Sequence, residues 1–142
     1  MIFVDTAAWV AISLKNDQFH RAAAKFQLQL RRSKEELLTS NFILDETYTV
    51  LLYQSDYANV VRFYNHMLVM IRGGILRVFH VTEEIEGEAW EVFKRFNQDK
   101  QWSFTDCTSK VIMDVSAVSE VFTFDRNFGQ MGFICSPTVI KE

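Results

Sequence analysis

Ile2-Phe3-Val4-Asp5-Thr6-Ala7-Ala8-Trp9 opens the chain with three β-prone apolar residues that run directly into an aspartate. A short, uninterrupted apolar run of this kind is typical of a strand buried on both faces. We expect the strand over residues 2–4 to end at Asp5 and a short helix to follow over residues 6–14. The opening therefore predicts a strand–helix unit with a carboxylate at its junction.

The same alternation continues along the chain. Further strands are expected at 37–39, 75–81, 120–124 and 133–135, and further helices at 17–32, 42–54, 57–72, 82–96 and 103–118. Asp17, Asn41 and Thr82 are the expected N-terminal caps of three of these helices, and Gly73-Gly74 is a natural helix end. Strands that alternate with helices indicate an α/β fold around a mainly parallel sheet of about five strands. No linker, repeat or low-complexity tract divides the sequence, so we expect one domain over residues 1–142.

Composition excludes several classes of protein. The chain has 142 residues, 49% of them hydrophobic, a net charge of −3 and two cysteines, which argues against disorder, a disulfide framework and a generally basic surface. Since no apolar run approaches the ~18–20 residues of a spanning helix and the start lacks a basic leader, we expect no membrane association and a cytoplasmic protein. Glycine-rich phosphate loops are absent, which disfavours dinucleotide-binding and P-loop folds.

Acidic residues from distant segments are expected at one edge of the sheet, because strand ends and helix starts of a parallel sheet meet there. Asp5 and Asp125 each follow a strand, while Glu46 and Asp106 lie in the opening turns of helices. Each residue taken alone has a local explanation: Asp5 as a helix cap, Asp106 in a capping box, Asp125 in an Asx turn and Glu46 at a solvated helix position. The helical periodicity leaves Asp45 and Glu46 as alternatives for the second position.

Together, these carboxylates imply a cation. Like charges a few ångströms apart repel by roughly 1–4 kcal/mol per pair at effective dielectrics of 80 to 20. Such a cluster needs a neutralising ion or retained protons, and oxygen ligands suit Mg²⁺ or Mn²⁺. The three histidines are isolated in the sequence, which argues against zinc.

Cationic side chains near two of the acids are candidates for phosphate contact. Lys110 follows Asp106 by one helical turn, and Arg126 directly follows Asp125. For Lys110, an ion pair with Asp106 at i, i+4 spacing is an equally good alternative.

The chain resembles the PIN-domain family, and within it the toxin ribonucleases of the VapC type. Besides the opening stretch, the segments that carry the resemblance are Leu44-Asp45-Glu46-Thr47, Trp102-Ser103-Phe104-Thr105-Asp106-Cys107 and Phe122-Thr123-Phe124-Asp125-Arg126-Asn127-Phe128, followed by Gly132-Phe133. They span almost the whole chain in the family's order.

This resemblance implies a three-layer α/β/α sandwich and a metal-dependent endoribonuclease that uses Mg²⁺ or Mn²⁺. It implies an RNA substrate, a small cognate antitoxin and a homodimer. It makes Asp5 and Asp106 the principal metal ligands. Glu46, rather than Asp45, and Asp125 complete the acidic group. Thr6 and Thr123 match the supporting hydroxyls of the family.

Two other functions fit parts of the pattern. A non-catalytic PIN-like module that binds protein or RNA is disfavoured because all of the acids are present. A flavodoxin-like phosphoacceptor domain would need an aspartate after strand three and a lysine after strand five, where this chain has His80-Val81 and Cys135-Ser136.

Overall fold

A computed structural model of the chain describes residues 1–139. Its centre is a five-stranded sheet in the order β3-β2-β1-β4-β5, and every neighbouring pair of strands is parallel. The elements are β1 (Ile2–Val4), α1 (Thr6–Ser13), α2 (His20–Arg32), β2 (Leu37–Ser40), α3 (Asn41–Gln54), α4 (Tyr57–Arg72), β3 (Leu76–Phe79), α5 (Glu83–Phe96), α6 (Phe104–Val115), β4 (Glu120–Phe122), α7 (Asn127–Gln130) and β5 (Ile134–Ser136). The predicted parallel α/β fold is confirmed.

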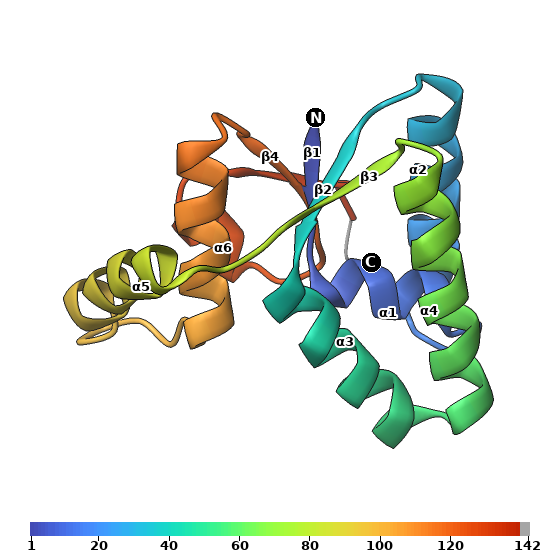
Figure 1. Ribbon diagram of the computed structural model, residues 1–142, viewed down its shortest axis with the longest axis horizontal. Helices are drawn as coiled ribbons and strands as arrows, with labels where there is room; N and C mark the ends of the chain where they lie inside the picture. Colours follow the sequence, from blue (N-terminus) through green and yellow to red (C-terminus); the bar gives the residue numbers. More distant parts are fainter. Residues whose placement is uncertain (140–142) are drawn as a thin grey trace.

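Helices cover both faces of the sheet, as expected for a three-layer sandwich. Figure 1 shows α5 and α6 on one side and α1, α2 and α4 on the other. The central strand β1 is fully enclosed, since Ile2, Phe3 and Val4 are all 0% exposed, which explains its uninterrupted apolar sequence. Within residues 1–139, none of the helices combines the length and the apolar character needed to cross a lipid bilayer.

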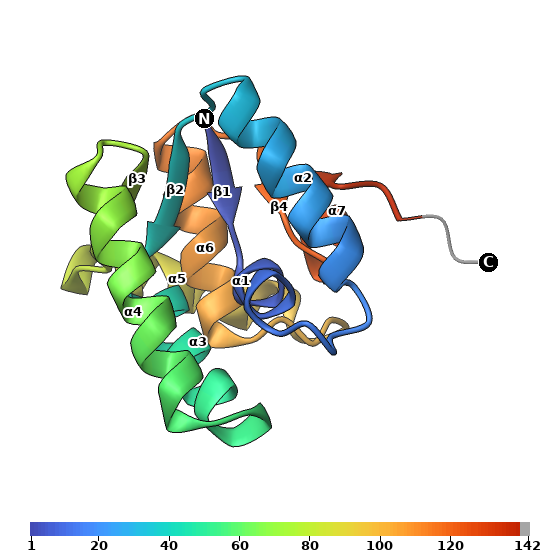
Figure 2. The same ribbon diagram turned by 90° about the vertical axis from the view of Figure 1, so that its right-hand side faces the viewer.

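Strand order separates this fold from the phosphoacceptor alternative. A flavodoxin-like sheet has the order 2-1-3-4-5, whereas β1 here lies between β2 and β4. In Figure 2 the arrows of β1 and β2 point toward α1 and α3, so the carboxyl ends of these strands lie beside the starts of the helices that follow them.

Some helices and strands begin or end at other residues than the sequence predicts. Helix α2 begins at His20 rather than at 17, because Asp17 Oδ1 accepts the Phe19 N–H at 2.8 Å and forms a turn first. The strand expected at 75–81 is limited to Leu76–Phe79, and the one-turn helix α7 was not predicted.

The predicted N-cap of α3 was wrong by one residue. Ser40 Oγ accepts the Ile43 N–H at 3.1 Å and caps the helix. Asn41 instead accepts the Val81 N–H through Oδ1 at 2.7 Å, which ties the start of α3 to the segment after β3. Both residue types are good caps, and the hydrogen bond of Asn41 to the segment after β3 decides between them.

We predict that Ser40→Ala lowers the free energy of unfolding by about 1 kcal/mol, because the α3 cap is lost. Chemical denaturation measures this. Ser116→Ala at the end of α6 is the control and should change stability by less than about 0.5 kcal/mol; equal effects of the two substitutions would contradict the assigned cap.

Candidate active site

Asp5 lies at the junction of β1 and α1, in the N-cap position of the helix, but its side chain makes no capping hydrogen bond. Its Oδ2 accepts a hydrogen bond of 2.9 Å from Thr123 Oγ1, which follows β4. Asp5 is 5% exposed and Thr123 is 2% exposed. The carboxylate is therefore fixed between two neighbouring strand ends and is not needed to cap α1.

Thr123 also positions the second acid of its own segment. Its Oγ1 accepts the Asp125 N–H at 3.0 Å, and Asp125 Oδ1 accepts the Asn127 N–H at 2.9 Å. The Asx turn anticipated at Asp125 is thus present. It directs the chain into α7 and holds Asp125 beside the end of β4.

Asp106 occupies the first turn of α6. It completes a capping box with Ser103, whose N–H donates to Asp106 Oδ2 at 3.1 Å. Asn127 Nδ2 donates to the same Oδ2 at 3.1 Å. Asp106 therefore has both roles considered from sequence: it caps a helix and lies at the sheet edge with the other acids.

Glu46, rather than Asp45, faces the sheet edge. Thr6 Oγ1 donates to Glu46 Oε2 at 3.2 Å, and Thr47 Oγ1 donates to Thr6 Oγ1 at 3.3 Å. This hydroxyl chain connects α3 to the start of α1. The alternative that helical periodicity left open is therefore decided by a contact between helices.

A single cleft of about 630 Å³ contains all of these acids. Its lining comprises Asp5, Thr6, Ala7, Val10, Asp17, Gln18, Phe19, Glu46, Val50, Gln54, Asp106, Phe124, Asp125 and Arg126. The predicted convergence of Asp5, Glu46, Asp106 and Asp125 at one edge of the sheet is thus present in the structure.

Burial and mutual repulsion destabilise the charged forms of these carboxylates. Burial, followed by the negative charge of Asp106, raises the pKa of Asp5 to about 7, although the Thr123 hydrogen bond partly opposes the shift. Loss of hydration likewise raises the pKa of Glu46, and the hydrogen bond from Thr6 lowers it again in part. Burial raises the pKa of Asp106 against the opposing hydrogen bond from Asn127.

No ion pair with a cation of the described part of the chain neutralises this group. Among residues 1–139, none of these carboxylates takes part in an ion pair. The alternative ion pair of Lys110 with Asp106 was wrong, since Lys110 Nζ binds Asp114 Oδ2 at 2.7 Å, one turn farther along α6. Arg126 does line the cleft.

The donor set fits a hard divalent cation by its chemistry and charge. Mg²⁺ and Mn²⁺ prefer carboxylate oxygens as ligands, and the negative charge of these carboxylates is not balanced by ion pairs within residues 1–139. In the part of the chain described, however, no three His, Cys, Asp or Glu side chains form a group that could hold an ion as they stand. The fit therefore rests on the kind of oxygen atoms in the cleft and on their unbalanced charge.

Two residues of the site were not predicted from the sequence: Asn127, which binds Asp106 without lining the cleft, and Phe19, which lines the cleft. The hydrogen bond of Asn127 to Asp106 joins α7 to α6, and Phe19 lies in the turn before α2. The only local signal for Asn127 is its position two residues after Asp125. The periodicity of the sequence predicts neither the hydrogen bond of Asn127 nor the place of Phe19 in the cleft, because both depend on how distant segments pack.

We predict that Asp5→Asn stabilises the protein in chelator at pH 8, with a melting temperature several degrees higher. Because the folded-state pKa of Asp5 is raised from 3.8 to about 7, the native state binds more protons than the unfolded state between these values. The wild type therefore loses stability as pH rises through this window.

Thermal unfolding from pH 4 to 8 tests this prediction. The advantage of the variant should shrink toward pH 4, where Asp5 is protonated in the native state. Asp99→Asn, on an exposed carboxylate, is the control. An Asp5→Asn protein that is no more stable than the wild type at pH 8 would contradict the assigned electrostatics.

Comparisons with known proteins agree with this geometry. The sequence matches the PIN domain family over residues 2–134. It is 34% identical over 136 residues to the 23S rRNA-specific endonuclease VapC20 of Mycobacterium tuberculosis, covering 94% of this chain and 96% of that protein. It is 26% identical over 126 residues to a VapC ribonuclease of Archaeoglobus fulgidus, covering 88% and 77% of the two chains.

Among solved structures, the crystal structure of M. tuberculosis VapC20, described as a sarcin–ricin loop cleaving toxin, superposes with a TM-score of 0.80. The two chains are 32% identical, and the match covers 94% of this chain and 97% of the other. Fold and sequence agree along nearly the whole length of the chain. The chain is a member of the PIN domain family.

Proposed function

We propose that the protein is an endoribonuclease of the VapC toxin type that depends on a divalent cation. The observation that carries the proposal is the single cleft that gathers Asp5, Glu46, Asp106 and Asp125. Relatives named as endonuclease and ribonuclease support it along nearly the full length of the chain. The intact acidic group argues against a binding module that lacks catalysis.

A structured RNA loop is the proposed substrate. VapC20 is described as specific for 23S rRNA and as cleaving the sarcin–ricin loop. We extend this substrate to the present chain as the first RNA to test.

Mg²⁺ or Mn²⁺ is the proposed cofactor, with Asp5 and Asp106 as its principal ligands. Such an ion supplies charge neutralisation at the phosphoryl oxygens and activation of water. Asp5 is buried and Asp106 is anchored by Ser103 and Asn127, so both oxygen donors are fixed in place before any ion binds. A fixed donor costs less entropy to immobilise on binding.

Glu46 is the proposed proton acceptor. Its pKa is raised, chiefly by loss of hydration, and a base whose pKa lies nearer to neutral pH accepts a proton more effectively. In the hydrolysis, the water oxygen bonds to phosphorus while one P–O ester bond breaks. The water proton passes to Glu46 Oε1 or Oε2, and the departing ester oxygen takes a proton from solvent.

The remaining residues position these groups. Thr6 holds Glu46 by a hydrogen bond, and Thr123 holds both Asp5 and the backbone of Asp125. Arg126 is the proposed contact to a neighbouring phosphate because it is exposed and lines the cleft. The phosphate contact of Lys110 stays a prediction, and Lys110 would first have to leave Asp114.

A small antitoxin protein is the proposed regulatory partner. The description of VapC20 as a toxin supports this partner. A homodimer remains our expectation from the family resemblance, and size-exclusion chromatography with light scattering would test it.

We predict that Asp106→Asn reduces RNA cleavage about 100-fold or more, because a metal-binding carboxylate is lost. Asparagine preserves the helix cap, so the fold should persist. Purified protein is incubated with 23S rRNA, with Mn²⁺ or with EDTA, and the cut ends are mapped.

Asp99→Asn is the control, since it removes an exposed carboxylate outside the cleft and leaves the ion pair of Lys110 with Asp114 intact. It should cleave like the wild type. Undiminished cleavage by Asp106→Asn, or equal cleavage in EDTA, would refute the proposed site.

We predict that millimolar Mn²⁺ or Mg²⁺ raises the melting temperature of the wild type by several degrees. A ligand that binds the native state alone stabilises it, by about 2.7 kcal/mol at 100 times the dissociation constant. Differential scanning calorimetry measures the shift against NaCl of the same ionic strength. The absence of any shift specific to the divalent ion would count against metal binding.

A further inference from the structure

Two phenylalanine rings from distant segments stack in the wall of the acidic cleft. Phe19 precedes α2 and Phe124 follows β4, yet their ring centroids are 4.6 Å apart and their planes differ by 1°. Both rings are partly exposed, and both line the cleft that holds the carboxylates. The stack thus presents aromatic surface directly beside Asp125.

The same pair borders a second cavity of about 280 Å³. The residues that line both cavities are Phe19, Phe124, Asp125 and Arg126, and the smaller cavity is completed by Thr123, Cys135, Pro137, Thr138 and Val139. The stacked rings therefore form a partition between the acidic cleft and a neighbouring hollow.

Core packing holds this partition in place. Phe124 meets the buried Phe122 edge to face, with ring centroids 6.2 Å apart. Phe26 also packs against Phe122, at 4.8 Å, but forms no aromatic pair with Phe19 or Phe124 among the described residues. Phe26 lines neither of the two cavities. A rigid aromatic surface that borders open space is suited to stacking, because little side-chain freedom remains to be lost on binding.

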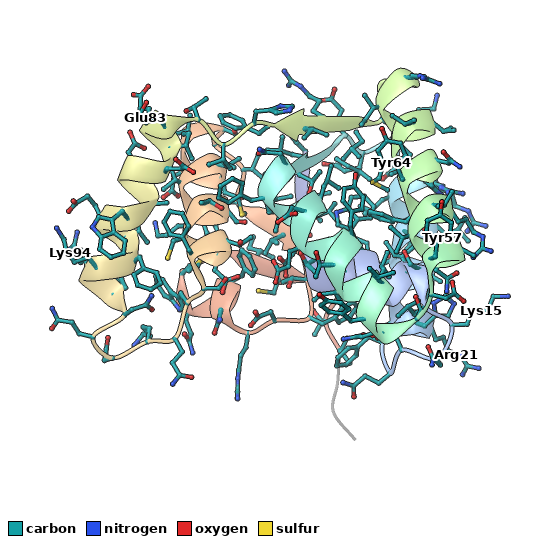
Figure 3. The ribbon with its side chains drawn as sticks, turned by 60° about the horizontal axis from the view of Figure 1, so that its bottom comes forward. Lys15, Arg21, Tyr57, Tyr64, Glu83 and Lys94 are labelled. Carbon is teal, nitrogen blue, oxygen red and sulfur yellow. The ribbon has the colours of Figure 1, made fainter. Side chains whose placement is uncertain are left out.

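Exposed cations lie close in sequence to both rings, among the acidic residues Asp17 and Asp125. Such cations suit the phosphates that flank a stacked base. Lys15 and Arg21 lie four residues before and two residues after Phe19 and are exposed. Figure 3 shows both at the surface where α1 passes into α2. Arg126, two residues after Phe124 in the sequence, is also exposed and lines both cavities.

We infer that the Phe19–Phe124 pair is a nucleobase-positioning platform. It stacks against the base of a nucleotide next to the scissile phosphate while that phosphate lies against the carboxylates. Base–aromatic stacking tolerates any base because every base has a π face. The pair acts by placing the RNA and takes no part in proton transfer; the inference rests on the proposed ribonuclease function.

The test combines ring removal with base removal. Phe19→Leu and Phe124→Leu keep apolar volume but lose the ring, Phe19→Tyr and Phe124→Tyr keep the ring, and Phe26→Leu is the control from the same aromatic cluster. The substrate is an RNA hairpin spanning the cut mapped in 23S rRNA. Matched hairpins carry an abasic ribonucleotide on one side of the cut or on the other.

For the wild type, an abasic nucleotide on one side of the cut should lower kcat/KM about tenfold. The leucine variants should cleave the intact hairpin with a kcat/KM about tenfold lower. The abasic nucleotide should lower their kcat/KM little further. The tyrosine variants should keep the wild-type sensitivity to the abasic nucleotide, and Phe26→Leu should behave like the wild type.

Different outcomes separate the two proposals. If the leucine variants show the same ratio of intact to abasic cleavage as the wild type, or if Phe26→Leu reproduces their loss, the platform is refuted and the nuclease stands. If the wild type cuts no RNA with Mn²⁺ or Mg²⁺, the ribonuclease function fails and the platform fails with it.

Discussion

The burial of several like-charged carboxylates at the carboxyl edge of the sheet is the constraint on which the rest of the structure depends. The fold brings Asp5, Glu46, Asp106 and Asp125 into one cleft, although they come from segments far apart in the chain. The cost appears as the raised pKa of Asp5, Glu46 and Asp106, in which burial is the largest cause. A protein retains such an arrangement where the charges have a use, and the use that we propose is to bind a divalent cation.

The scaffold holds these acids with short hydroxyl side chains. Thr123 links the ends of β1 and β4 through Asp5, and Thr6 links α1 to α3 through Glu46. These bonds orient the oxygens without adding positive charge, so the negative charge of the cleft is not neutralised. Hydrogen bonds in a site of low dielectric are also stronger than in water, which favours a fixed arrangement of donors.

Features that depend on local sequence patterns were predicted correctly, whereas contacts between distant segments were not. The apolar run Ile2–Val4 predicted a buried central strand, and the alternation of elements predicted the parallel sheet that places the acids at one edge. Ser40 rather than Asn41 caps α3 because Asn41 binds a backbone group after β3. The stack of Phe19 on Phe124 was likewise invisible, since residues 105 positions apart in the chain meet only in the folded protein.

Calorimetric titration of the metal-free protein with Mn²⁺, in buffers of different ionisation enthalpy, tests the central claim most directly. The slope of the observed enthalpy against buffer enthalpy counts the protons released on binding. Because Asp5 has a pKa of about 7 without metal, the account predicts saturable binding with clear proton release at pH 6 and little at pH 8.5. Binding without proton release at pH 6, or no binding at either pH, would contradict it.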